Sequence, residues 1–462
     1  MIKKIIAILF MVLVSLLVVM GVKEYKAVRE DNELKEQNKP EEKDEIIIWY
    51  SYEEYGEYLK YVADTYKTAS GIDVVIKYIS ASEQGDMIDA IAEANGNAGQ
   101  MPDLYITNSQ NLEELYLLGL CKENTNNKVN EDNYSKAALE SITYKDKYYA
   151  YPLGFEMSAF VYNKKYVTSV PSTFDDIKLY AENFNDLGEN DSSEESGEET
   201  NAGTEEGTET EEIVDYSVVE DIIVWDANNM KSNYGFIGKY IDFKGTYSAK
   251  DEEIDVDEEK FSSAILYYKE LYDYFSLESK ATGTEEENYQ QIVSDFSEGK
   301  IVFTILNIKS LKELDGLGVE YGVCPLPQLS STLGTCPLSE TDIVVVNPYS
   351  SDVTRAEEFA SYLTFNISFK LYDITGLLPA KKMKTYDNDA LMEIANEYAY
   401  STGFPKLIRL SDYWLKIENL FKSVNAATTE TIIPDEGAED EEIIIDNSAV
   451  EEIISDFLVN LN

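Results

Sequence analysis

Short apolar runs alternate with amphipathic segments in the first quarter of the chain. Residues 46–50, 72–79 and 104–106 are apolar or β-branched over a few positions, which is typical of buried strands. Between them, the apolar residues of 55–66 and of about 84–94 recur at the spacing of one helix face. The order of strand, helix, strand, helix and strand predicts a parallel sheet covered by helices.

The same alternation continues through the rest of the chain. Strands at 148–151 and 157–162 are expected to be joined by a turn at 152–156. Further strands are predicted at 222–225, 301–306, 321–323 and 343–346, and further helices after Pro171, at 261–274, 289–296 and 355–365, and at the C-terminus. No internal repeat of about 20–50 residues is visible, which excludes solenoids and propellers.

The N-terminus carries a targeting or anchoring signal. Two lysines precede an unbroken apolar run at residues 5–22, and charged residues follow it at once. The run is longer than the ~7–15 residues of a signal-peptide core, lacks a small-residue cleavage pattern, and reaches the ~18 residues of a membrane span. We expect an uncleaved anchor, with a cleaved signal as the alternative, and a charged linker at 23–44. Either one places the rest of the chain on the extracytoplasmic side.

Residues 186–215 differ in kind from the sequence around them. They contain thirteen Asp or Glu and no Lys or Arg, and the remainder is mostly Gly, Ser, Thr and Asn. Such a composition cannot bury enough apolar surface to order itself. The segment is therefore predicted to be a disordered acidic insertion on the surface of a folded domain.

Composition narrows the classes of function. The chain has 462 residues, of which 44% are hydrophobic, so it can form two or three folding units with sizeable cores. Its 88 Asp and Glu against 38 Lys and Arg give a formal charge of −50. This charge argues against nucleic acid as a partner, because phosphate contacts require basic patches.

The side chains that most often carry catalysis or bind metals are scarce. There is no histidine, which removes His-dependent triads and His-ligated metals. The three cysteines show no C-x-x-C spacing. No cofactor, metal site or catalytic residue is therefore predicted. Cys324 and Cys336 flank a short loop, and the sequence leaves open whether they form a disulfide or are two separate thiols.

Several short segments, taken in their order and spacing, resemble one known family. They are IIIWYS at 46–51, MPDL at 101–104, YAYP at 149–152, YNK at 162–164, PSTFD at 171–175, FSEGK at 296–300, YGVCPLP at 321–327, GLLP at 376–379 and YW at 413–414. On these motifs the chain resembles the extracellular solute-binding proteins of ABC importers, of the class typified by maltose- and oligosaccharide-binding proteins.

The resemblance implies an α/β fold of two lobes joined by a hinge, the periplasmic-binding-protein fold, with the ligand in the cleft between the lobes. By the match, lobe 1 comprises residues 45–153 and 342–388, and lobe 2 comprises 154–341 and 389–462. The implied function is capture of a sugar or sugar-like small solute by hinge closure, and its delivery by a monomer to an ABC permease in the membrane. The protein would not be an enzyme.

Polar residues that follow two of the predicted strands are candidate ligand contacts, because open α/β sheets bind ligands beyond the ends of their strands. These candidates are Ser51, Tyr52, Glu53, Thr107, Asn108 and Gln110. The resemblance adds Glu156, which matches a cleft carboxylate, and Trp414, which matches a stacking tryptophan on a late helix. Sugar recognition needs such rings for the apolar ring face and such polar groups for the hydroxyls.

One departure from the family pattern concerns the stacking ring. Where the family often has Asn-Gly-x-Trp after the strand at 301–306, this chain has Leu-Asn-Ile-Lys, so Lys309 replaces the tryptophan and is itself a candidate ligand contact. Trp225 is a candidate for a replacement ring. Asp342, at an expected lobe crossing, is a further candidate contact.

Three alternative interpretations stay open at this point. Polyamine-binding proteins share a related two-lobe fold and use cleft carboxylates, so a cationic solute is the alternative ligand class. A surface sensor or adhesin would use the same fold without a permease. A glycoside hydrolase would need two carboxyl groups about 5–9.5 Å apart, and no motif for such a pair is present.

Overall fold

The structure is a computed structural model that describes residues 45–80, 87–95, 101–191, 214–244, 253–280, 283–406, 412–432 and 444–461. The anchor or signal predicted at 5–22, the linker at 23–44 and most of the acidic insertion lie outside these ranges. Helix α7 (Phe174–Asp191) includes the first six residues of the predicted insertion. No helix within the described ranges combines the length and the hydropathy of a membrane crossing.

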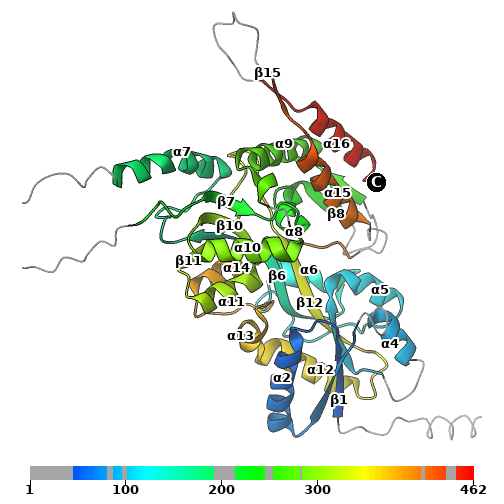
Figure 1. Cartoon of the computed structure of the whole chain (residues 1–462). Helices are drawn as coiled ribbons and strands as arrows, with labels where there is room; N and C mark the ends of the chain where they lie inside the picture. Colours follow the sequence, from blue (N-terminus) through cyan, green and yellow to red (C-terminus); the bar gives the residue numbers. More distant parts are fainter. Residues whose placement is uncertain are drawn as a thin grey trace, which may run out of the picture.

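The largest sheet in the described part of the chain has ten strands and is built around the order β2-β1-β3-β12-β6-β10-β7 (Figure 1). These strands are β1 (Glu45–Tyr50), β2 (Asp73–Tyr78), β3 (Leu104–Asn108), β6 (Tyr151–Asn163), β7 (Asp221–Trp225), β10 (Ile301–Asn307) and β12 (Leu338–Val346). β1 pairs in parallel with β2 and β3, and β7 pairs in parallel with β10. The predicted parallel α/β arrangement is therefore confirmed.

Shorter strands extend this sheet or form separate pairs. β11 (Tyr321–Cys324) and β13 (Leu378–Pro379) pair with β6, and β14 (Thr402–Gly403) pairs with β12. The separate pairs are β4 (Thr143–Tyr144) with β5 (Lys147–Tyr148), β8 (Ile241–Lys244) with β9 (Glu253–Val256), and β15 (Glu430–Ile432) with β16 (Ile444–Asp446).

Strand β6 joins the two parallel parts of the sheet. Its first half pairs antiparallel with β12 through Met157, and its second half, from Ser158 onward, pairs with β10 and β11. The predicted turn at 152–156 is therefore wrong, because those residues continue one strand. Pro152 lies beside an irregularity in the β6–β12 register, and a Cβ on Gly154 would come within 2.7 Å of Leu371. Proline and glycine here mark a bulge and a close approach of neighbouring segments.

Helices cover the sheet in two groups, one on each side of β6 and β12 (Figure 1). Near β1–β3 lie α2 (Tyr55–Ser70), α4 (Met87–Asn95), α5 (Leu112–Leu117), α12 (Val353–Ser361) and α13 (Leu371–Thr375). Near β7 and β10 lie α7, α8 (Met230–Tyr234), α9 (Glu258–Tyr274), α10 (Glu285–Ser297), α15 (Tyr413–Ala426) and α16 (Ser448–Val459). α6 (Lys136–Ser141), α11 (Ile308–Leu317) and α14 (Asp389–Tyr398) lie close to the crossing strands.

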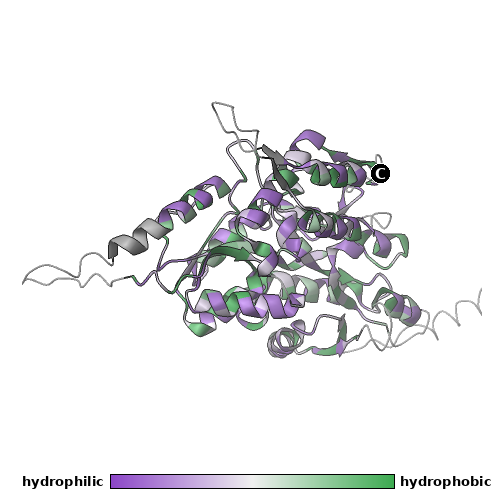
Figure 2. Cartoon of the chain, turned by 45° about the horizontal axis from the view of Figure 1, so that its top comes forward, coloured by the Kyte–Doolittle hydropathy of each residue, from purple (hydrophilic) through white to green (hydrophobic). Residues whose placement is uncertain are grey.

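Burial follows the helical spacing predicted from the sequence. In α2 the buried residues include Tyr55, Tyr58, Leu59, Val62 and Tyr66, and the helix ends at a glycine in the left-handed conformation. Apolar residues gather along the strands and polar residues lie on outer helix faces (Figure 2). Two hydrophobic clusters result, one centred on β1, β3 and β12 and the other on β7, β10, α9 and α15.

The three cysteines are free thiols. Cys324 is buried in β11, while the Cys336 sulfur lies 3.5 Å from the carbonyl oxygen of Tyr400. Of the two possibilities that the sequence left open, the structure has two separate thiols.

Candidate functional site

Two adjoining cavities form one cleft where the two groups of helices meet the crossing strands. One cavity has a volume of about 560 Å³ and the other about 390 Å³. Glu156, Lys231, Lys309 and Glu340 line both cavities, so the two are parts of one continuous cleft.

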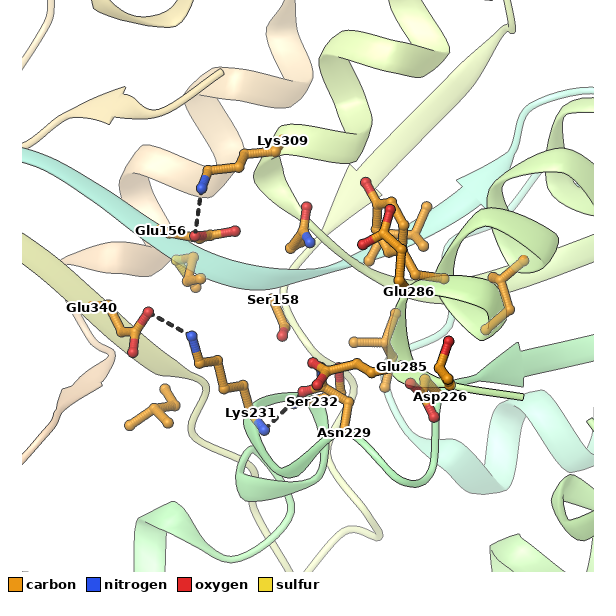
Figure 3. Close-up of a pocket in the computed structure, with 18 of the residues that line it drawn as sticks. Glu156, Ser158, Asp226, Asn229, Lys231, Ser232, Glu285, Glu286, Lys309 and Glu340 are labelled. Atoms are coloured by element: carbon orange, nitrogen blue, oxygen red, sulfur yellow. Dashed lines mark hydrogen bonds and ion pairs between the residues drawn. The ribbon is translucent and has the colours of Figure 1, made fainter. Parts of the chain in front are cut away.

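Two lysines and three carboxylates alternate in the middle of the cleft. Lys309 Nζ lies 2.9 Å from Glu54 Oε1 and 3.4 Å from Glu156 Oε2, and Lys231 Nζ lies 2.7 Å from Glu340 Oε2. Figure 3 shows the Lys309–Glu156 and Lys231–Glu340 pairs side by side, with Ser158 between them and the acidic residues of α10. Glu54 precedes α2 and Lys309 is in the first turn of α11, so this pair joins segments that are 255 residues apart in the sequence.

These pairs keep the charges of the central residues in place. Burial alone would lower the pKa of Lys309, but Glu156 and Glu54 outweigh it and hold the pKa above its usual value. The balance is the same at Lys231, where Glu340 holds the pKa above its usual value against burial. Burial raises the pKa of the Glu156 carboxyl, and the attraction of Lys309 opposes that rise. Both lysines are therefore cations at neutral pH and available to donate hydrogen bonds.

Asp342 lies on β12 in the smaller cavity and is hydrogen-bonded to α2. The Tyr55 hydroxyl donates to Asp342 Oδ2 at 2.7 Å. Burial raises the pKa of Asp342 to about 7; this hydrogen bond opposes the rise, and the negative charges of Glu340, Glu54 and Glu156 add to it. The carboxyl of Asp342 therefore titrates close to neutral pH.

Amide side chains at the end of β3 form another wall of the smaller cavity. Asn108, Gln110 and Asn111 line it, together with Tyr52 from the loop after β1. Asn108 Oδ1 accepts a hydrogen bond from the Gln110 backbone N–H and caps the short 3₁₀ turn Ser109–Asn111. Thr107 is buried and accepts a 2.8 Å hydrogen bond from Asn111 Nδ2, so it positions that amide rather than lining the cavity.

Aromatic rings line the larger cavity through Tyr289 and Phe404. Tyr289 is on α10, and its hydroxyl donates to Ser310 Oγ at 2.6 Å. Phe404 packs on Trp414 with 4.0 Å between ring centroids. Trp414 is partly buried and packs against the second hydrophobic cluster, and Trp225 is 0% exposed with its Nε1 donating to Asn233.

The structure brings six of the eleven predicted contact residues together in the cleft. They are Tyr52, Asn108, Gln110, Glu156, Lys309 and Asp342. The other five, Ser51, Glu53, Thr107, Trp225 and Trp414, are not among the residues that line the two cavities. Trp225 is a core residue in this structure, whereas Trp414 is partly buried and packs against the second hydrophobic cluster.

Sequence reasoning missed several residues that line the cleft, among them Lys231, Glu340, Asp226 and Glu285. A signal existed for two of them. Glu340 lies two positions before Asp342 on one strand and therefore shares its face. Asp226 directly follows β7, and Ser51 was a candidate because it has the same position relative to its own strand. No local pattern indicated Lys231 or Glu285.

Comparisons with known proteins agree with this architecture. Over 399 residues the chain is 19% identical to a maltodextrin-binding protein of Bacillus subtilis, covering 81% of this chain and 84% of that protein. It is 25% identical over 235 residues to a maltotriose-binding protein of Pyrococcus abyssi, covering 50% of this chain and 43% of that protein, less than half of the relative's length.

The fold is also that of a solved extracellular solute-binding protein from Staphylococcus aureus in complex with maltose. The TM-score is 0.66 at 18% identity, over 91% of this chain and 98% of that one. The expected two-lobe α/β fold is thereby confirmed. The model of the family of bacterial extracellular solute-binding proteins matches residues 61–391. The chain therefore belongs to this family of extracytoplasmic binding proteins of ABC transporters, which are not enzymes.

Proposed function

We propose that the protein captures a carbohydrate in the cleft and passes it to an ABC permease. The observation that supports a carbohydrate is the cleft lining, which combines rings with hydrogen-bonding groups of both kinds. Tyr289 and Phe404 offer apolar faces, the Glu156 carboxylate accepts hydrogen bonds, and Lys309 donates them. Similar proteins are named for binding maltotriose and maltodextrin. We propose the same ligand class here.

The proposed contacts are the lining residues Tyr52, Asn108, Gln110, Glu156, Lys309 and Asp342, together with Tyr289. By the family resemblance, Lys309 stands in the place of a stacking tryptophan. It is held by two carboxylates, so its role is to donate hydrogen bonds to hydroxyls rather than to stack on a sugar ring.

Hinge closure of two lobes is the proposed mechanism, with lobe 1 at 45–153 and 342–388 and lobe 2 at 154–341 and 389–462. Support comes from the main sheet, in which β6 changes its pairing partner between Met157 and Ser158. Small backbone rotations near this point would change the width of the cleft. We propose that the closed monomer is the form recognised by the permease, and that residues 5–22 anchor the chain to the membrane.

Ligand-induced stabilisation of the full-length chain tests the carbohydrate assignment. A ligand at a hundredfold its Kd adds about 2.7 kcal/mol to the free energy of unfolding. We expect this gain with one class of oligosaccharide, and we expect Glu156→Gln to lose most of it because the carboxylate acceptor is gone. Glu258→Gln, at the exposed start of α9, is the control and should keep the gain. Stabilisation by amino acids or polyamines, and by no sugar, would refute the proposal.

A further inference from the structure

The two ends of the cleft differ in how their carboxylates are balanced. In its middle, Lys309 and Lys231 are each paired with carboxylates. At the far end of the larger cavity lie Asp226, Glu285 and Glu286. No ion pair in the described part of the chain includes any of these three. Figure 3 shows them on the side of the cavity away from the lysine pairs.

Asp226 is the most unusual of the three, because it is buried without a cation. Its side chain follows β7 and is 7% exposed. One carboxylate oxygen, Oδ1, accepts from the Asn228 backbone N–H at 3.0 Å and from Asn288 Nδ2 at 3.4 Å. The other, Oδ2, has no hydrogen-bond partner. A buried carboxylate oxygen without a donor is costly, and it favours a ligand that supplies one.

Glu285 adds a second negative charge near Asp226. It accepts a hydrogen bond from Asn229 Nδ2, and its charge contributes to the raised pKa of Asp226, which burial dominates. Glu285 and Glu286 lie in the first turn of α10, whose N-terminus is capped by Thr284. The helix dipole makes a negative charge favourable at this position.

We propose that this acidic end of the cleft binds a protonated amine, and that the captured solute is an amino sugar or an oligosaccharide that contains one. The inference rests on the carbohydrate-binding function proposed above. An ammonium group carries three donors and a positive charge, so it satisfies Asp226 Oδ2 and offsets the carboxylates together. A sugar hydroxyl supplies a donor but adds no positive charge beside Asp226. In the middle of the cleft, Glu156 and its neighbours would contact the hydroxyl-bearing part of the same ligand.

Titration calorimetry of the full-length chain with three tetrasaccharides, of which the two amino-sugar probes share one backbone linkage, tests this inference. The probes are a glucosamine tetramer, an N-acetylglucosamine tetramer and maltotetraose, at pH 6 where the amine is protonated. A hydrogen bond to a charged group is worth about a tenfold or larger change in affinity. We expect the glucosamine tetramer to bind at least about tenfold more tightly than either neutral sugar, and the preference to fall as salt is raised.

Two variants assign the preference to this end of the cleft. Asp226→Asn keeps the size of the side chain, and Glu285→Gln removes one charge from the cavity wall. Each should remove most of the preference for the amine while leaving the affinity for maltotetraose or the N-acetylated tetramer within about twofold. Glu258→Gln, also the first residue of a helix but exposed and outside the cleft, should preserve the preference.

The outcomes separate this inference from the proposed function. Equal affinity for the three sugars, or equal losses for charged and neutral sugars in both variants, would overturn the amine site while carbohydrate binding stands. No binding of any sugar would overturn both. A preference for the amine that Glu285→Gln removes would support the site even if Asp226→Asn fails to fold.

Discussion

Lys309 offers the most direct test of how charge is balanced inside the cleft. The change Lys309→Met removes an ammonium group 2.9 Å from Glu54 Oε1 and 3.4 Å from Glu156 Oε2, and keeps an unbranched side chain. The exposed side-chain fractions are 36% for Lys309, 30% for Glu54 and 21% for Glu156. The cluster is therefore intermediate between a surface pair and a buried one.

The expected magnitude follows from this intermediate burial. Exposed ion pairs contribute about 0–1 kcal/mol, whereas removing one partner of a buried pair costs about 3–5 kcal/mol. Water screens part of the attraction at Lys309, so the cost of removing it should lie between these two ranges and closer to the lower one. We expect Lys309→Met to reduce the free energy of unfolding by about 1–2 kcal/mol at pH 8. The control Lys422→Met breaks an exposed pair with Glu418 on α15 and should cost less than about 0.5 kcal/mol.

The stronger test is how the stability lost in Lys309→Met depends on pH. Burial raises the pKa of Glu156 and Lys309 opposes that rise, so the variant should have a still higher Glu156 pKa. A carboxyl whose folded-state pKa is raised favours the folded state at low pH, and this contribution is lost as pH rises through that pKa. The deficit of Lys309→Met should therefore be smaller at pH 5 than at pH 8. Urea unfolding at both values measures it. An equal deficit at both, or one no larger than that of Lys422→Met, would refute the reasoning.

Three further predictions concern single groups. The pKa of Asp342 is raised to about 7, so the wild type should lose stability as pH rises from about 4 to about 7, and Asp342→Asn should flatten this part of a urea-unfolding profile; an unchanged profile would contradict the assignment. Tyr289→Ala should weaken carbohydrate binding about tenfold in calorimetry through loss of its ring, while Tyr289→Phe should bind within about twofold of wild type; equal losses would implicate the hydroxyl instead. Because Cys324 and Cys336 are free, dithiothreitol should not change the thermal midpoint, and a drop on reduction would indicate a disulfide.

Local spacing determined the elements that depend on neighbours within a few residues. The helical recurrence at 55–66 predicted α2 and its buried face, because residues three and four apart share one side of a helix. The turn predicted at 152–156 was wrong because proline and glycine favour a turn only where no neighbouring strand pairs with them. In the fold, β12 and β13 pair with these residues on either side and hold them in a continuous strand.

The predicted contact residues also differ in whether local sequence or the tertiary structure determined their place. Tyr52, Asn108 and Gln110 were found because the end of a strand is a position that the sequence specifies. Trp225 was a candidate as a replacement ring and Trp414 through the family resemblance, but a tryptophan is found in a core as well as in a cleft. Burial of Trp225 and the packing of Trp414 behind Phe404 depend on which segments meet around them.

The sequence by itself determined the α/β class, the family resemblance and the strand ends that point into the cleft, because each depends on spacing within a short stretch of chain. The tertiary structure decided which charges meet. Lys309 with Glu54, Lys231 with Glu340 and Asp226 beside Glu285 are brought together by strand pairing and helix packing over tens to hundreds of residues. Electrostatic balance depends on distance and burial, and the linear order of residues specifies neither.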